Sequence, residues 1–304
     1  MPSARGGRRV SLPGRLGPAI VHLRLHFQAI LAPIFLWGMV LAQSRPDALT
    51  WLVFVAYHVF LYGGATAFNS VYDRDTGPVG GLRRPPPVDP FLLPWSLGVL
   101  AVGLLLAAAR PATALVYAVI LALALAYSYP GVRLKARPFA SVLTIGAGQG
   151  VLPFVAGWLA TPSPHGLSPI SLLGALSAAF VAIALYPLTQ LYQIEEDRQR
   201  GDRTVAVVLG PSRCFALSHG LLLAAAGFTV ATIVSRFGWM QAVFMLACFA
   251  AIGLALEWWR RHFSAWGVVQ NFHAAMALTV VGSAGFAVYL VWQLVAASMA
   301  SISS

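Results

Sequence analysis

The sequence predicts an all-α, multi-pass membrane protein with nine transmembrane helices. The first observation is composition: 59% of the 304 residues are hydrophobic, only 10% are charged, and the mean hydropathy is +0.76. Soluble domains are about 45–50% apolar and about 25% charged, so an ordinary soluble fold is excluded. The second observation is that apolar stretches long enough to cross a bilayer recur along the whole chain. The third is that basic residues gather in alternate loops, as they do in membrane proteins.

Nine apolar stretches approach the length of a transmembrane helix, which needs about 20 residues to cross about 30 Å of hydrocarbon. The fourth is short and the first carries Arg24, but neither feature removes the span. Residues 1–16 are predicted to form a basic segment in the cytoplasm, and residues 17–298 a single transmembrane domain. The predicted spans are 17–42, 49–72, 91–109, 112–129, 139–160, 169–194, 213–234, 239–257 and 272–298.

The net charge of +11 reports the orientation of the chain. Seventeen of the 20 lysines and arginines fall in the N-terminal segment and in every second loop. By the positive-inside rule these segments face the cytoplasm, which predicts a bacterial cytoplasmic membrane with a cytoplasmic N-terminus. No soluble basic surface remains, so nucleic acid is excluded as a partner. The 17 residues are Arg5, Arg8, Arg9, Arg15, Arg24, Arg74, Arg83, Arg84, Arg133, Lys135, Arg137, Arg198, Arg200, Arg203, Arg213, Arg260 and Arg261.

Seven of the nine acidic residues lie in two segments of the same arginine-rich face. In each segment a carboxamide precedes an aspartate by four residues, Asn69 before Asp73 and Gln193 before Asp197. On a helix this spacing places both side chains on one face. The segments are separated by 124 residues and four spans, which predicts a tandem repeat of four-helix units plus a ninth helix. The seven acids are Asp73, Asp75, Asp89, Glu195, Glu196, Asp197 and Asp202.

Carboxylates at these positions are expected to have a cationic partner. The C-terminal end of a helix carries partial negative charge and repels an acid by about 0.3–1 kcal/mol. Oxygen ligands from carboxylates and carboxamides suit Mg²⁺, which commonly shares its site with substrate phosphates. The alternative is that the two segments are solvated loop charges at helix ends.

A third stretch completes the pattern: a Tyr-Ser-x-Pro sequence at 127–130 is followed by Arg-Leu-Lys at 133–135. With these three motifs the chain resembles the UbiA superfamily of intramembrane prenyltransferases. The first motif of that superfamily is Asn-x₃-Asp-x₃-Asp, and Gly77 stands at its last position here. The second is Asp-x₃-Asp followed by Gly and Thr, and Gln193 stands at its first position. The positions that match the motifs are Asn69, Asp73, Asp197, Gly201 and Thr204.

The resemblance implies nine helices around a central cavity in which Mg²⁺ and a prenyl diphosphate donor bind. It implies transfer of the prenyl group, through an allylic carbocation, to a lipophilic acceptor such as an aromatic ring or a quinone precursor, with membrane lipids around the protein.

The expected catalytic residues are Asn69, Asp73, Lys135 and Asp197. The expected Mg²⁺ ligands are Asp73, Asp75, Glu196 and Asp197. The expected diphosphate ligands are Arg24, Asn69, Arg133, Lys135 and Arg137. Further cavity residues are expected at Gln149, Gln190, Tyr192, Gln193 and Glu195.

Two alternatives remain open at this point. Because each acidic motif lacks one acid, the chain could be a membrane terpene cyclase, in which a double bond of the donor itself attacks the cation. A more distant alternative is a secondary transporter of an organic phosphate, because an internal repeat with polar residues is also typical of carriers. The turn-forming segment 77–87 is either a lid over the phosphates or an ordinary membrane loop.

Overall fold

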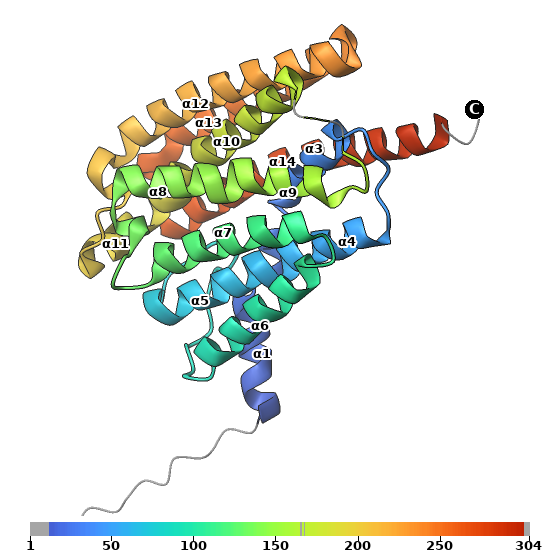
Figure 1. Ribbon diagram of the computed structural model, residues 1–304. Coiled ribbons are helices and arrows are strands. Elements are labelled where there is room, and N and C mark those ends of the chain that lie inside the picture. Colours follow the sequence, from blue (N-terminus) through green and yellow to red (C-terminus); the bar gives the residue numbers. More distant parts are fainter. Residues whose placement is uncertain (1–11, 165, 167, 301–304) are drawn as a thin grey trace, which may run out of the picture.

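The computed structural model describes residues 12–164, 166 and 168–300, so most of the predicted basic segment 1–16 lies outside the described residues. The described chain is a bundle of helices that lie side by side (Figure 1). The α-helices are α1 (Leu12–His22), α2 (Leu25–Gln28), α3 (Ala32–Leu41), α4 (Ala48–Val55), α5 (Gly63–Asp73), α6 (Leu92–Ala107), α7 (Pro111–Ser128), α8 (Pro138–Ile145), α9 (Leu152–Ala160), α10 (Pro169–Gln190), α11 (Ile194–Arg200), α12 (Val205–Phe237), α13 (Trp239–His262) and α14 (Val268–Ala300). Short 3₁₀ turns are η2 (Leu134–Ala136), η4 (Leu191–Gln193) and η5 (Phe263–Ala265).

Within the described residues, seven helical segments are long and apolar enough to cross a membrane. An eighth is present if the segments Gly14–Gln28 and Ala32–Leu41, which meet at a bend of 45°, form one span. Helix α6 has 16 residues, about 24 Å at 1.5 Å per residue, and so falls short of the bilayer core. The protein is therefore an integral membrane protein, while the ninth span and the tandem repeat remain predictions.

Two spans contain a π-helical turn where the sequence predicts regular helix. The turn η1 (Ala56–Tyr62) lies between α4 and α5, and η3 (Gly146–Val151) lies between α8 and α9. The two turns contact each other, because the Tyr62 hydroxyl donates a 2.9 Å hydrogen bond to the carbonyl of Gly148. π-Turns inside α-helices are often found at functional sites, and both of these residues line the internal cavity described below.

Helices α3 and α9 cross at very short range through two glycines. A Cβ atom on Gly38 would lie 1.9 Å from the carbonyl oxygen of Phe154, and one on Gly157 would lie 1.9 Å from that of Phe35. Small residues allow membrane helices to approach in this way. The crossing fixes α3, and with it Trp37, against the wall of the cavity.

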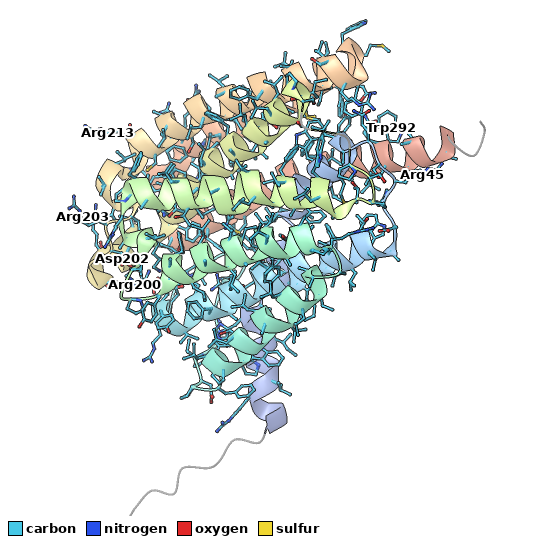
Figure 2. The ribbon with its side chains drawn as sticks, viewed as in Figure 1. Arg45, Arg200, Asp202, Arg203, Arg213 and Trp292 are labelled. Atoms are coloured by element: carbon cyan, nitrogen blue, oxygen red, sulfur yellow. The ribbon has the colours of Figure 1, made fainter. Side chains whose placement is uncertain are left out.

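The two ends of the bundle differ in charge. Figure 2 shows Arg200, Arg203 and Arg213 at one end, and Arg45 at the other. The end that carries the first three is called the arginine-rich end below.

Candidate active site

A cavity of about 770 Å³ runs into the bundle from the arginine-rich end. Most of its wall is apolar and comes from α3, α7, α10, α13 and α14, with residues such as Trp37, Leu123, Phe249 and Phe286. The charged residues that line it belong to the segments singled out in the sequence. They are Arg24, Asp73, Asp75, Lys135, Asp197 and Arg200. The cavity therefore has a charged mouth and an apolar interior.

The first acidic segment ends α5, and its two motif residues face the cavity one helical turn apart, as the spacing predicts. The amide of Asn69 donates a 3.0 Å hydrogen bond to the Ser128 hydroxyl, which belongs to the Tyr-Ser-x-Pro stretch. The side chain of Asp73 is 5% exposed. Its Oδ2 pairs with Nζ of Lys135, whereas its Oδ1 is buried and accepts no hydrogen bond from the described residues. Asp73 thus keeps one buried oxygen without a hydrogen bond.

The loop after α7 brings in the two cations that flank Asp73. Arg133 has a left-handed backbone (φ 45°), which reverses the chain and starts the 3₁₀ turn η2. In this turn Lys135 points inward and is buried. Arg133 lies 3.6 Å from Oδ1 of Asp73 and makes two hydrogen bonds, of 2.6 and 2.8 Å, to the carboxylate of Asp202. Arg137 is exposed and does not line the cavity, so the structure does not bring it to the other predicted diphosphate ligands.

The second acidic segment forms the short helix α11, and Asp197 is its buried acid. Oδ2 of Asp197 accepts a 3.1 Å hydrogen bond from Thr204, and Oδ1 accepts a 2.6 Å hydrogen bond from Arg200. Arg200 also donates a 2.6 Å hydrogen bond to Asp75. A single guanidinium therefore joins the two acidic segments, which are far apart in the sequence.

The two glutamates of α11 lie outside the cavity. Glu196 is half-buried and accepts a 3.0 Å hydrogen bond from the backbone N–H of Thr76, so it ties α11 to the first segment. Glu195 is exposed and interacts with Gln199 and Arg198 on its own helix. Of the predicted Mg²⁺ ligands, the structure places Asp73, Asp75 and Asp197 on the cavity wall and Glu196 behind it.

The ion pairs outside the spans stabilise the charged forms of their members. Burial opposes the charge of Arg200, but hydrogen bonds with Asp75 and Asp197 and the charges of nearby aspartates raise its pKa. Burial likewise opposes the charge of Asp202, but the hydrogen bonds and charge of Arg133 hold the pKa of this carboxyl below its ordinary value. The hydrogen bond with Asp202 also raises the pKa of Arg133. These groups form a fixed array of charges at neutral pH.

The break between α1 and α2 sends Arg24 into the cavity mouth. Arg24 has a left-handed backbone (φ 50°) and is buried, and it donates a 2.9 Å hydrogen bond to Ser70. The segment 77–87 covers this region: Val79 and Gly80 line the cavity, and a nitrogen of His26 lies 2.9 Å from the carbonyl oxygen of Gly81. The segment therefore closes one side of the mouth, next to Arg24.

The neutral polar residues predicted for the cavity are Gln149, Gln190, Tyr192 and Gln193, and all four line it. Gln190 has a structural role as well, because its side chain accepts a 3.2 Å hydrogen bond from the backbone N–H of Ala206.

The donor set of the mouth fits Mg²⁺. Among the described residues, no three His, Cys, Asp or Glu side chains are close enough together to form a metal site by themselves. Mg²⁺, however, keeps several waters and is usually bound by one or two carboxylates together with substrate phosphates. The buried Oδ1 of Asp73, which accepts no hydrogen bond from the described residues, is an oxygen ligand of this kind.

Sequence reasoning missed the central position of Arg200, which it treated as one of many loop arginines. One signal was present, because Arg200 lies three residues after Asp197 and thus on the same helix face. It also missed Trp37 and Tyr62, which line the cavity but lie outside every motif.

Comparisons with known proteins agree with this geometry. The sequence model of the UbiA prenyltransferase family matches residues 31–266. A lycopene elongase/hydratase from Haloferax volcanii is 28% identical over 298 residues, covering 91% of this chain and 94% of the relative. A digeranylgeranylglyceryl phosphate synthase from Natronomonas pharaonis is 29% identical, covering 78% and 86%. The solved structure of a UbiA homologue from Archaeoglobus fulgidus bound to GPP and Mg²⁺ has the same fold, with a TM-score of 0.70, 19% identity, and coverage of 91% of this chain and 99% of that one.

Proposed function

The chain belongs to the UbiA prenyltransferase family, and we propose that it transfers a prenyl group from an allylic isoprenyl diphosphate to a lipophilic acceptor in a Mg²⁺-dependent reaction. The observation that carries this proposal is a single cavity of about 770 Å³ with an apolar interior and a charged mouth, to which both acidic segments contribute. A prenyl diphosphate has the same two parts, a charged head and a hydrocarbon tail. The relatives named for lycopene elongation and for a prenylated glyceryl phosphate support a long isoprenoid substrate.

The carboxylates would hold Mg²⁺, with Asp73 foremost because its buried Oδ1 accepts no hydrogen bond from the described residues, and with Asp197 and Asp75 on the same wall. Asn69 lies one turn from Asp73 and would complete the oxygen ligands of the first segment. Bound there, Mg²⁺ would stabilise the charge that builds up on the departing diphosphate. Glu196 supports the site from behind through its hydrogen bond with Thr76.

Lys135 and Arg24 are the cations that would bind the diphosphate directly, because both are buried and line the cavity. The bond between C1 of the prenyl group and the diphosphate oxygen breaks, and the electron pair leaves with the oxygen. Preorganised positive charge beside that oxygen favours the break, since it is already in place when the charge develops. An allylic carbocation remains in the cavity.

The apolar wall would protect this cation from water until the acceptor attacks. The rings of Tyr62, Tyr127 and Tyr186 line the cavity and offer π faces to a cation. A double bond or aromatic ring of the acceptor then supplies the electron pair for the new C–C bond, and the acceptor loses a proton. Because the charged lining residues all lie at the mouth, a neutral acceptor suits the interior better than a second phosphate.

The acceptor would enter from the membrane along α13 and α14. Phe244 and Trp258 of α13 and Val281 of α14 line the cavity and are also exposed on the outer surface. A lipophilic acceptor, whether a polyene, an aromatic compound or a quinone precursor, would reach the mouth without leaving the lipid.

The test is incubation of the purified protein in nanodiscs with Mg²⁺ and geranyl, farnesyl or geranylgeranyl diphosphate. Lycopene, an aromatic acid and a quinone precursor are supplied separately, and one sample has no acceptor. We expect diphosphate release together with an acceptor whose mass increases by one prenyl group less one hydrogen. A cyclic hydrocarbon formed without acceptor would instead establish the terpene cyclase. Phosphate flux across proteoliposomes that survives Asp73→Ala and Asp197→Ala would overturn the enzyme in favour of a transporter.

A further inference from the structure

Arg200 occupies the space between the two acidic segments. Its Nη1 donates a 2.6 Å hydrogen bond to Oδ1 of Asp75, and its Nη2 donates one of 2.6 Å to Oδ1 of Asp197. Its Nη1 also lies 3.2 Å from the backbone carbonyl oxygen of Asp73, and its Nε lies 3.4 Å from Asp202. The side chain is 19% exposed, while those of Asp75 and Asp197 are 3% and 8% exposed. A half-buried guanidinium is thus held by acids of both segments.

These bonds leave the acids unequal in their capacity to bind a metal. Both oxygens of Asp197 are engaged, one by Arg200 and the other by Thr204, and Oδ1 of Asp75 is engaged by Arg200. By contrast, Oδ1 of Asp73 is buried and accepts no hydrogen bond from the described residues. An oxygen that accepts a short, charge-assisted hydrogen bond does not offer the same lone pair to a metal. Asp73 pairs with Lys135 through Oδ2, and Arg133 lies 3.6 Å from its Oδ1. Of the buried carboxylate oxygens in the described part of these two segments, Oδ1 of Asp73 is nevertheless the one that accepts no hydrogen bond.

The local sequence fits this arrangement. Gly77 stands where the first motif would have its last acid, and a Cβ atom there would lie 3.1 Å from Oε2 of Glu196. Gln193, a neutral residue, stands where the second motif would begin. The mouth has fewer carboxylates than the full motifs would give, and the guanidinium supplies a positive charge between those that remain.

We infer that the guanidinium of Arg200 takes the place of a second metal ion between the two acidic segments. The mouth then binds a single Mg²⁺, at Asp73 and Asn69, together with the donor diphosphate. The guanidinium is planar, stays charged throughout the physiological pH range and holds fixed hydrogen-bond directions, so it can neutralise Asp75 and Asp197 permanently. This inference rests on the proposed function for the identity of the anion. Because Arg200 also lines the cavity mouth, it would add positive charge near the donor diphosphate.

The test counts metal ions without turnover. Purified protein in nanodiscs is titrated with Mn²⁺ in the presence of geranyl S-thiolodiphosphate, a donor analogue that does not ionise, and bound Mn²⁺ is counted by electron paramagnetic resonance. We expect one Mn²⁺ per chain in the wild type and in Arg200→Lys. We expect two in Arg200→Ala, because the variant frees Asp75 and Asp197 for a second ion.

The matched control is Arg198→Ala, because Arg198 is on the same helix but 55% exposed, and its one ion pair among the described residues is with Glu195 at 3.9 Å. It is expected to keep a count of one. Two Mn²⁺ in the wild type would overturn the inference, as would a count in Arg200→Ala that does not rise or one in Arg198→Ala that does. If Arg200→Ala does not fold, the wild-type count alone decides. Because the analogue is not consumed, these counts are independent of the transfer assay, which by itself decides the proposed function.

Discussion

Two aspartates stand at opposite ends of one span, Ala48–Asp73, and have opposite surroundings. Asp47 precedes the first turn of α4, where the helix carries partial positive charge, and it accepts a 2.8 Å hydrogen bond from the backbone N–H of Thr50. Its other oxygen pairs with Arg110. Asp73 ends α5, where the helix carries partial negative charge, and it pairs with Lys135 through Oδ2. Its Oδ1 is buried and accepts no hydrogen bond from the described residues. Both oxygens of Asp47 are therefore engaged, whereas Asp73 keeps one buried oxygen without a hydrogen bond.

The difference between Asp47 and Asp73 suggests two criteria that distinguish a structural acid from a functional one in this chain. Position in the helix is the first criterion, because an acid is favourable at an N-terminus and unfavourable at a C-terminus. Spare bonding capacity is the second. The first criterion needs a helix boundary, which a sequence indicates readily. The second needs the bonding partners of the acid, which a sequence indicates less readily.

The largest effect is expected for Asp73→Asn, which keeps the shape of the side chain and removes its charge. The rate of diphosphate release should fall by about a thousandfold, because charge stabilisation at the leaving group is lost. Release is measured with purified protein in nanodiscs. Asp47→Asn is the matched control and should retain nearly the wild-type rate, because Asp47 lies at the other end of the span. An equal loss of diphosphate release in both variants would contradict the distinction between Asp73 and Asp47.

A smaller loss is expected for Lys135→Met, which removes the cation that pairs with Asp73 but keeps most of the apolar stem. We expect kcat/KM for the donor to fall by about a hundredfold. Lys135→Arg keeps the charge and should recover part of the activity. Activity in Lys135→Met equal to that of the wild type would remove Lys135 from the set of diphosphate ligands.

The comparison also predicts where the donor tail lies. With the reaction at the arginine-rich end, the tail must extend along the apolar wall toward the other end. There Trp37 lines the cavity, packs against Phe286 and donates a 3.1 Å hydrogen bond to Ser177. Trp37→Leu should shift the preference toward the next longer donor by about tenfold, measured as a ratio of kcat/KM values. Trp292→Leu is the control, because Trp292 lies outside this cavity and is 53% exposed, and it should leave the ratio unchanged.

The sequence predicted the all-helical membrane fold and the segments that build the mouth, because hydropathy and charge are properties of local sequence. It did not predict the π-turns η1 and η3, which depend on packing between spans. Lys135 and Arg137 looked equivalent as phosphate ligands, but the 3₁₀ turn η2 buries the first and exposes the second. The partner of Arg200 on the first segment, Asp75, is 125 residues away. No local pattern could have identified that pair.

A modest effect on stability is expected for Asp47→Ala. This substitution removes the helix cap and leaves Arg110 without that partner, which should cost about 1 kcal/mol of unfolding free energy. The midpoint of thermal unfolding should fall by about 2–4 °C. It is measured by following the loss of helical circular dichroism, with Asp47→Asn expected to lose less because asparagine also caps helices. An unchanged midpoint would mean that the capping bond contributes nothing to stability.

The smallest effect concerns Asp202, an acid of the arginine-rich end that resembles Asp47 in being fully bonded. Both of its oxygens accept hydrogen bonds from Arg133, which hold its pKa below the ordinary value of 3.8. When the folded state has the lower pKa, the unfolded state binds more protons, so the contribution to stability is present above about pH 4 and is lost as the pH falls below that value. The thermal midpoint of Asp202→Asn should therefore lie below that of the wild type at pH 7, and the gap should shrink by pH 3. A gap that stays constant from pH 7 to pH 3 would show that the charge of Asp202 does not stabilise the fold. In that case spare bonding capacity, and not charge pairing, would be the property that distinguishes Asp73 from the other acids of its end.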